Sequence, residues 1–220
     1  MVTGGTDRQY EDIVILGAGG HGRQLRDIIE AEDRGRGSSR RVIGFLDDGK
    51  VDEELLGRRG DRLLGATSLV QDLDVGVAVG IADPAIRRRL GDASRAAGRA
   101  LVSAVHPSAA IGSLVVWGDG AMVSAGVFLD TNVRMGRLCH LNVHTSVGHD
   151  SILGDHVTVL PGARISGAVT IGDDVLIATN AVLFPGVHVG DRAVIAAGAV
   201  VHHDVPPDTT FLGLGKNRAG

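Results

Sequence analysis

The chain has 220 residues, enough for one large or two small hydrophobic cores, and a net charge of −4 that argues against a nucleic-acid partner. Aromatic residues make up only 3% of it and glycine occurs 33 times, which favours a repetitive, thin-walled architecture built from Val, Ile, Leu and Ala. The single cysteine, Cys139, excludes an internal disulfide framework and suits the cytoplasm. The first residues are polar, which argues against a signal peptide, and no run of about 20 apolar residues is present that could span a membrane.

The first half of the chain alternates short apolar runs with charged segments of helical pattern. In chain order we predict a strand at 13–16, a helix at 24–31, strands at 41–46 and 75–80, a helix at 84–97 and a strand at 101–105, with 53–73 as linker and a short helix. This order implies right-handed crossovers and a small, parallel, doubly wound sheet. We therefore expect a disordered N-terminus over 1–10 and a Rossmann-like domain over 11–105.

A glycine-rich turn joins the first predicted strand to the first predicted helix. Gly17, Gly19 and Gly22 form a G-x-G-x-x-G pattern, which lets the backbone and a helix N-terminus approach a phosphate. Asp47, at the end of the next strand, stands where NAD-binding proteins carry an acidic residue for the ribose. The alternative is that Asp47-Asp48-Gly49 is only a turn.

The second half of the chain follows a strict six-residue period. Every sixth residue from 111 to 201 is apolar, a run whose chance occurrence is about one in several hundred thousand at average composition. The sixteen positions are Ile111, Trp117, Val123, Leu129, Met135, Leu141, Val147, Leu153, Val159, Ile165, Ile171, Ile177, Leu183, Val189, Ile195 and Val201. Small or branched residues lie two places before them, and glycine or small polar residues often follow directly.

A period of six fits neither an α-helix nor long strands, but it is typical of a parallel β-helix. In each unit the apolar residue points into the lumen, a small residue fills the space beside it, and glycine or a polar residue makes the turn. A single coil cannot bury its inner face alone and does so only against the neighbouring coils, so the stability of the β-helix grows with the number of stacked coils. We predict this β-helix over 106–205 and a C-terminal tail over 206–220.

The repeat, as in Ile171-Gly172-Asp173-Asp174-Val175, resembles that of the hexapeptide-repeat acyltransferases. The glycine-rich turn, Phe45-Leu46-Asp47-Asp48 and the segment 148–155 (GHDSILGD) narrow the resemblance to the sugar O-/N-acyltransferase branch, which contains the bacillosamine and perosamine N-acetyltransferases and the sialic acid O-acetyltransferases. It extends from about Ile13 to Gly213. The resemblance implies a left-handed prism, a homotrimer, and acetyl transfer from acetyl-CoA to the amino group of a nucleotide-linked amino sugar.

His149 and Asp150 stand where that branch carries its catalytic histidine and an acidic residue. A histidine suits the role of general base because its ordinary pKa lies near 6.5, and a carboxylate beside it fixes the tautomer. Adjacent residues of a strand point to opposite faces, so the pair must lie at a corner of the prism. The alternative is that His149 is merely solvated, and we expect no chemical role for His140 or His144.

A metal site is the other interpretation of these histidines, because His144 and His149 are five residues apart. Zinc sites take at least three protein ligands. With 18 residues per coil, Thr131 and Ser113 stack below His149, and Gly126 and Ser108 stack below His144, so no third histidine is supplied. We therefore expect no metal.

The resemblance also implies two sets of binding residues. For the nucleotide-sugar substrate these are Gly19, Gly20 and His21 at the phosphates or sugar, Asp47 and Asp48 at the nucleobase, Gly80 at the pocket floor, and Asn142. For acetyl-CoA they are Thr158, Gly167, Thr179 and Ala197, with Lys216 near a CoA phosphate. Relatives often have histidine at the position of Thr158, where only a hydroxyl remains to bind the thioester carbonyl. A neighbouring chain is expected to complete the site.

Three alternatives stay open at this point. The same fold could acylate a hydroxyl group or a different small acceptor. The chain could be a scaffold that binds nucleotide-sugars without catalysis, or an NAD-dependent oxidoreductase fused to a trimerising prism.

Overall fold

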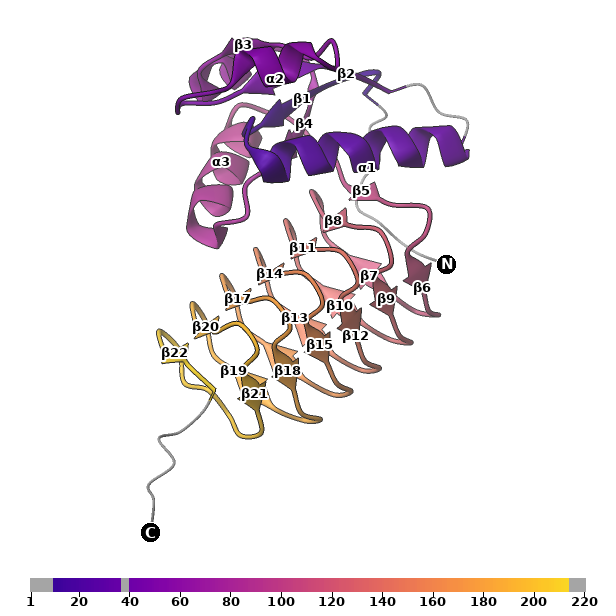
Figure 1. Cartoon of the computed structure of the whole chain (residues 1–220), viewed down its shortest axis with the longest axis vertical. Coiled ribbons are helices and arrows are strands. Elements are labelled where there is room, and N and C mark those ends of the chain that lie inside the picture. The colour runs from indigo at the N-terminus through magenta and orange to yellow at the C-terminus, as the bar shows by residue number, and fades with distance from the viewer. Residues whose placement is uncertain (1–9, 37–39, 214–220) are drawn as a thin grey trace.

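The structure is a computed structural model that describes residues 10–36 and 40–213. An N-terminal α/β domain covers one end of a long, three-sided β-helix, and the chain leaves the β-helix at the opposite end (Figure 1). Most of the predicted disordered segment 1–10, and Lys216 in the predicted tail, lie outside the described residues. Within the described part of the chain, no helix combines the length and the apolar character needed to cross a membrane.

The N-terminal domain is built on a parallel sheet of order β3-β2-β1-β4. Its elements are β1 (Asp12–Leu16), α1 (Gly20–Arg36), β2 (Arg41–Leu46), α2 (Glu53–Gly57), β3 (Leu63–Gly65), the 3₁₀ helix η1 (Thr67–Gln71), β4 (Gly76–Val79) and α3 (Pro84–Ala96). The predicted strands at 13–16, 41–46 and 75–80 and the helix at 84–97 are confirmed. The segment 53–73 is more ordered than predicted, because β3 pairs with β2 inside it.

The first residues of both long helices, α1 and α3, explain why each helix begins where it does. Asp83 caps α3 by accepting a hydrogen bond from the Ile86 amide at 2.9 Å, and Pro84 fits the first turn, where no amide donor is needed. The other helix, α1, begins four residues earlier than predicted, within the glycine-rich turn. A Cβ on Gly22 would lie 1.8 Å from the Gly17 carbonyl oxygen, so only glycine lets this first turn close.

The β-helix has three faces, each named here after its first strand. The β5 face consists of β5 (Ala104–Val105), β8 (Met122–Val123), β11 (His140–Leu141), β14 (Thr158–Val159), β17 (Leu176–Ile177), β20 (Val194–Ile195) and β22 (Thr210–Phe211). The β6 face consists of β6 (Ala110–Ile111), β9 (Phe128–Leu129), β12 (Ser146–Val147), β15 (Arg164–Ile165), β18 (Val182–Leu183) and β21 (Val200–Val201). The β7 face consists of β7 (Val116–Trp117), β10 (Arg134–Met135), β13 (Ile152–Leu153), β16 (Thr170–Ile171) and β19 (His188–Val189).

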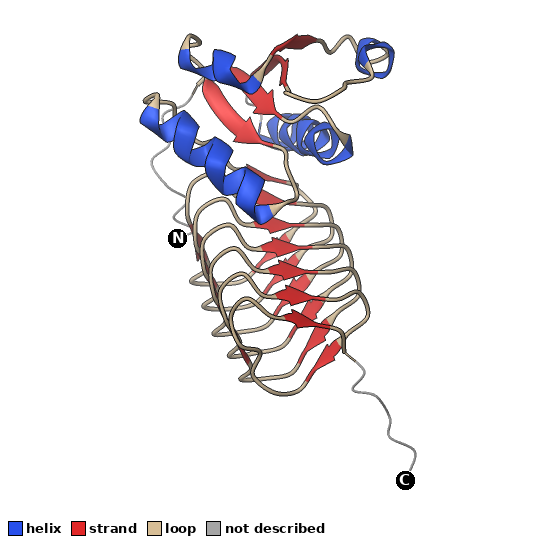
Figure 2. Ribbon diagram, turned by 90° about the vertical axis from the view of Figure 1, so that its left-hand side faces the viewer, coloured by secondary structure: helices blue, strands red, loops and turns tan. Residues whose placement is uncertain are grey.

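The coils stack in register: each coil consists of three hexapeptides, so a strand pairs with the strand three hexapeptides further along the chain, as Arg134 pairs with Ile152. Figure 2 shows the strands in line along the faces of the column. The apolar residue predicted to point inward is the second residue of each strand, and fourteen of the sixteen are buried, with Ile111 and Trp117 half-buried against the same core. The six-residue pattern therefore predicted the lumen correctly.

The residue that makes the turn at each corner differs from the predicted one. The left-handed backbone falls three places after fifteen of the sixteen inward residues, for example at Asn132 and Asp150 with φ of 57° and 60°. The glycines that follow the inward residues directly have another reason to be small. A Cβ on Gly148 would lie 2.5 Å from the Gly167 amide nitrogen on the next coil, so these glycines allow close stacking of corners.

The prism extends beyond both of its predicted bounds. Ala104 and Val105 pair with β8, so the strand predicted at 101–105 is divided: only Leu101 bridges to Val77 in the N-terminal sheet. At the other end Thr210 and Phe211 pair with β20, inside the predicted tail.

The N-terminal domain lies on the β5 face. Met122, His140 and Thr158 are the outward residues of three successive strands of this face, and each is only 1% exposed. Met122 packs with Ile28 and Ile29 of α1 in one apolar cluster. The two domains therefore share a core, and the β5 face is closed to other partners over these coils.

A fully buried arginine joins the domains where α3 meets the coils. Arg87 donates from Nε to the Leu138 carbonyl at 2.8 Å and from Nη2 to the His156 carbonyl, both at corners of the β-helix. Its Nη1 donates to the Ile81 and Ala82 carbonyls, in the loop that follows β4. Burial lowers the pKa of Arg87 to about 10, so the side chain stays charged near neutral pH.

Candidate active site

His149 lies at the corner between β12 and β13, where the β6 face meets the β7 face. Because Asp150 has a left-handed backbone, its carboxylate turns back onto the imidazole, with 2.8 Å between His149 Nδ1 and Asp150 Oδ2. The side chains are 57% and 54% exposed. The corner that the pair requires is thus present.

The partner of Nδ1 determines which nitrogen of His149 is free. An ionised carboxylate only accepts hydrogen bonds, so Nδ1 carries the proton and Nε2 keeps its lone pair. Hydrogen bonds from Asn132 and then from His149 hold the pKa of Asp150 below its ordinary value, so the carboxylate stays ionised. The free Nε2 is a base in an exposed position.

The imidazole of His149 packs over the backbone of Gly167, one coil further on. A Cβ on Gly167 would lie 2.5 Å from Nε2 and 2.7 Å from Cε1 of the ring. Glycine at 167 therefore leaves the space that the ring occupies.

A second polar cluster lies where α1 meets β11. His21 Nε2 and His140 Nδ1 are 2.9 Å apart, and Gln24 donates to the Asn142 side-chain carbonyl at 2.8 Å. Burial, with a smaller effect of the Arg87 charge, lowers the pKa of His21 to about 4 and that of His140 well below its ordinary range. Both imidazoles are therefore neutral at pH 7.

The glycine-rich turn is open at its tip and packed at its base. Gly19 and Gly20 are exposed, and no atom lies within 4 Å of a Cβ on Gly19, so the amides at the N-terminus of α1 are accessible to an anion. Gly80 was expected at the pocket floor, but it is buried, and its Cβ would lie 2.4 Å from the Gly22 Cα. It supports the first turn of α1.

The two aspartates after β2 hold protein groups. Asp47 accepts from the Ala18 and Gly49 amides, each at 2.7 Å, and so ties the glycine-rich turn to its own turn. Asp48 accepts from the amide and the hydroxyl of Thr67, which lower its pKa. This arrangement favours the interpretation of these residues as a structural turn over the nucleobase contact expected from the resemblance.

The residues expected at acetyl-CoA lie apart within one chain. Thr158 is buried and donates to the Ala82 carbonyl at 2.7 Å, so its hydroxyl is engaged in the domain junction. Thr179 and Ala197 follow one another up the corner between the β5 and β6 faces, whereas Gly167 lies on the corner between the β6 and β7 faces.

The same topology separates the base from the substrate pocket. The corner of His149 lies opposite the β5 face, which carries the N-terminal domain. One chain therefore does not bring His149 to its own His21.

Two residues of the site region were missed from the sequence. Asn132 donates to Asp150 Oδ1 at 2.7 Å, and subtracting one coil of 18 residues from 150 would have identified it. Arg87 was not predicted, because no local pattern marks its contact with the coils.

The histidines of the β-helix do not form a metal centre in the described part of the chain. His144 lies on the corner between the β5 and β6 faces, away from the corner of His149. Among the residues that the structure describes, no group of three or more His, Cys, Asp or Glu side chains converges.

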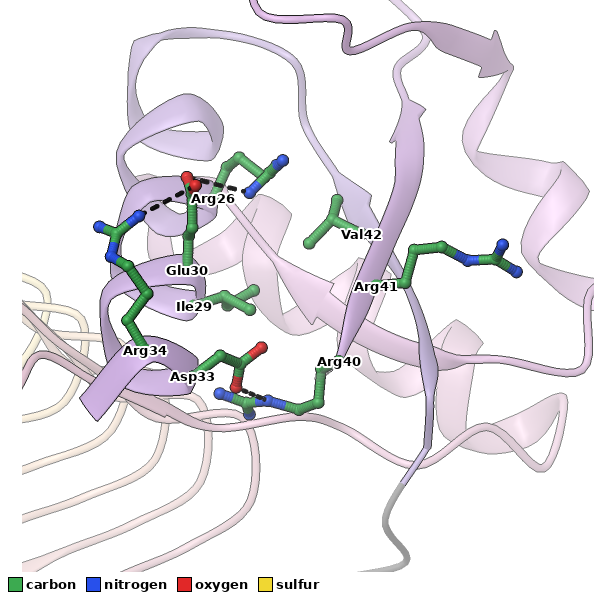
Figure 3. Close-up of a pocket in the computed structure, with 8 residues that line it drawn as sticks. All are labelled: Arg26, Ile29, Glu30, Asp33, Arg34, Arg40, Arg41 and Val42. Atoms are coloured by element: carbon green, nitrogen blue, oxygen red, sulfur yellow. Dashed lines mark hydrogen bonds and ion pairs between the residues drawn. The ribbon is translucent and has the colours of Figure 1, made fainter. Parts of the chain in front are cut away.

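A hollow of about 370 Å³ lies between α1 and β2, away from the glycine-rich turn (Figure 3). Each of its charged side chains is in an ion pair: Glu30 pairs with Arg26 and Arg34, Asp33 pairs with Arg40, and Arg41 pairs with Asp12, which lies outside the lining. No histidine lines the hollow, so it offers no counterpart to the corner of His149.

Two family models match the chain. The model described as the PglD N-terminal domain matches residues 12–93, and the bacterial transferase hexapeptide model (six repeats) matches residues 168–203. The first covers the domain with the glycine-rich turn, and the second covers coils of the prism beyond His149.

Individual relatives match over more of the chain. The GDP-perosamine N-acetyltransferase of Escherichia coli O157:H7 is 31% identical over 159 residues, which is 71% of each chain. PerB from Caulobacter crescentus, solved in complex with CoA and GDP-perosamine, is 29% identical with a TM-score of 0.79, covering 90% of this chain and 91% of that one. The acetyltransferase domain of PglB from Neisseria gonorrhoeae FA1090, in complex with acetyl coenzyme A, is 28% identical with a TM-score of 0.80, covering 90% and 93%.

Proposed function

The chain belongs to the sugar acyltransferase family that includes the GDP-perosamine N-acetyltransferases, and on this basis we propose that it transfers an acetyl group from acetyl-CoA to the amino group of a nucleotide-linked amino sugar. The observation that carries the proposal is the exposed His149–Asp150 pair, whose geometry leaves Nε2 free as a base. The relative from Escherichia coli O157:H7 is a GDP-perosamine N-acetyltransferase, which favours an amine over a hydroxyl as acceptor.

The reaction follows from this geometry. The neutral sugar amine attacks the thioester carbonyl carbon, and His149 Nε2 takes the proton that the nitrogen loses. Asp150 stabilises the imidazolium that forms, through the hydrogen bond to Nδ1. The new C–N bond remains, the C–S bond breaks, and the proton passes from His149 to the departing CoA sulfur.

The nucleotide-sugar fits the tip of the glycine-rich turn. The amides around Gly19 and Gly20 suit the diphosphate, and the neutral His21 beside them suits a hydrogen bond to phosphate or sugar. The complex of PerB with GDP-perosamine supports a guanosine diphosphate amino sugar as the first acceptor to test.

A homotrimer is part of the proposal, because two chains are needed to assemble the site. The corner with His149 and Gly167 and the corner with Thr179 and Ala197 both border the β6 face. In a threefold arrangement with the β6 faces toward the axis, the first corner of one chain lies beside the second corner of the next. Asn142 begins that second corner, so the neighbour's substrate pocket lies there too.

The β6 face has the character of such an interface. Its outward side chains include Phe128 and Val200, which are 47% and 44% exposed in the single chain. Burying these apolar groups between chains would stabilise the assembly. A cytoplasmic location belongs to the same proposal, because the free, buried Cys139 suits a reducing compartment.

The function is tested by mixing the chain with acetyl-CoA and GDP-perosamine and measuring the release of free CoA thiol and the mass of the acetylated sugar. We expect both products with GDP-perosamine or a related amino sugar nucleotide. We expect neither with the matching hydroxyl sugar. The absence of acetylation across a panel of such amino sugars would refute the proposal.

The shared site predicts complementation between two inactive variants. Gly19→Trp blocks the turn, where the structure has room for a side chain, and His149→Ala removes the base. Each alone is expected to be inactive, whereas co-expression in equal amounts restores about a quarter of wild-type activity, since one site in four combines two intact halves. Size-exclusion chromatography with light scattering checks the trimer. Mixed trimers without activity would mean that each site is built within one chain.

Gly167→Ala is expected to slow the reaction without unfolding the protein. The backbone of Gly167 is not left-handed, so alanine fits the chain, but its methyl group takes the space of the His149 ring. Displacing the base by about 1 Å is expected to lower kcat by about 100-fold. Gly57→Ala, where nothing lies within 4 Å, is the control for thermal stability and rate. An unchanged kcat would show that the ring does not need this position.

A further inference from the structure

We propose that Asn132 is a positioning residue for the reaction, which holds the Asp150 carboxylate against His149 from the preceding coil. The proposal rests on the function proposed above, in which His149 is the base. Asn132 Nδ2 donates to Asp150 Oδ1 at 2.7 Å, and Asp150 Oδ2 lies 2.8 Å from His149 Nδ1. Each oxygen of the carboxylate therefore has one partner, and the three side chains form a hydrogen-bonded chain at the corner.

The pair needs such support because it is exposed. Interactions between solvent-exposed groups are weak, and the side chains of His149 and Asp150 are more than half exposed. The amide of Asn132 fixes one carboxylate oxygen without neutralising the charge that stabilises the imidazolium. Its hydrogen bond is also the largest cause of the lowered pKa of Asp150, ahead of that from His149.

The register of the coils explains how Asn132 reaches Asp150. Both occupy the left-handed position of their corner, with φ of 57° and 60°, and the two positions are one coil apart. The backbone is fixed by regular stacking bonds: the Asn132 amide donates to the Ser113 carbonyl at 2.9 Å and the Asp150 amide to the Thr131 carbonyl at 3.1 Å. The side chains thus start from parallel Cα positions, close enough for a direct bond.

Asparagine at this position has a competing explanation, because it tolerates a left-handed backbone better than most residues. Arg192 has the same φ of 57° at the same place in its hexapeptide, and its side chain bonds the Asp208 carboxylate on the next coil at 2.6 and 2.8 Å. It serves as the matched comparison, because it is a left-handed residue that holds an exposed aspartate on the corner between the β7 and β5 faces, which does not border the β6 face.

The test compares Asn132→Gly with Arg192→Gly. Glycine keeps the left-handed backbone in both variants and removes only the side chain that bonds the aspartate. For Asn132→Gly we expect kcat to fall at least about 10-fold, as for the loss of a hydrogen bond to a charged group, with the KM values for both substrates unchanged. Arg192→Gly is expected to keep the wild-type kcat, and both variants to unfold at the same temperature.

A double-mutant cycle separates positioning from a structural role. If Asn132 acts through Asp150, Asn132→Gly has no further effect on kcat once Asp150→Ala is present. Asn132→Asp keeps the shape but places a second carboxylate beside Asp150, and is expected to be at least as slow as Asn132→Gly. A wild-type kcat for Asn132→Gly, or losses that add in the double variant, would overturn the proposal.

A measurement without substrate keeps this proposal distinct from the proposed function. In ¹⁵N-histidine-labelled protein, we expect the signal of His149, assigned with His149→Ala, to show the Nδ1-protonated tautomer in the wild type and a mixture in Asn132→Gly. The same tautomer in both proteins would refute positioning by Asn132. If the wild type shows this tautomer but acetylates no sugar, the proposed function fails while the role of Asn132 stands.

Discussion

Replacing His149 by alanine is expected to lower kcat for acetyl transfer by about 100- to 10,000-fold, the range found when a general base is removed. The amine must lose a proton as it attacks the thioester, and no other base shares the corner: Asp150 and Asn132 are engaged with each other. The thiol-release assay at saturating concentrations of both substrates measures the change. The KM for the nucleotide-sugar should stay near the wild-type value, because the glycine-rich turn is unaltered.

Two controls show that such a loss is chemical. His149 is more than half exposed, so His149→Ala should unfold at the wild-type temperature. His188→Ala removes an exposed imidazole from β19 on the β7 face and should keep the wild-type kcat. A His149→Ala variant that turns over as fast as the wild type would exclude His149 as the base.

The β-helix was predictable because its constraint is periodic and local. Each short strand must bury its second residue in the lumen, so positions such as Leu153 and Ile171 are apolar without exception. The ends were predicted less well: Val105 lies six residues before Ile111 but was assigned to the N-terminal domain, and Phe211 does not fall on the six-residue period.

The site could be predicted only as far as its chemistry is local. His149 and Asp150 are adjacent in the sequence, and a corner is the one place where adjacent side chains meet. Thr158 and Gly80 were assigned to ligands from the resemblance, since spacing does not reveal what packs against either residue. The structure gives both a packing partner instead: the Ala82 carbonyl for Thr158 and the Gly22 backbone for Gly80.

Arg87→Met is expected to destabilise the protein by about 3 kcal/mol and to lower the Tm by about 10 °C. The guanidinium is the donor for four carbonyl groups in the junction, and methionine fills much of the volume but donates nothing. Buried carbonyls that lose a charged donor retain the cost of their desolvation. Thermal unfolding followed by circular dichroism at fixed protein concentration measures the change.

Arg89→Met provides the matched control, because Arg89 lies on the exposed side of the same helix and should unfold like the wild type. Arg87→Lys distinguishes charge from geometry: an ammonium group keeps the charge but does not span carbonyls from three segments, so most of the loss should remain. Equal Tm values for Arg87→Met and Arg89→Met would show that the junction does not depend on the guanidinium. The loop at Ile81 and Ala82 follows the strand beneath the glycine-rich turn, so a loosened junction should also raise the KM for the nucleotide-sugar more than that for acetyl-CoA.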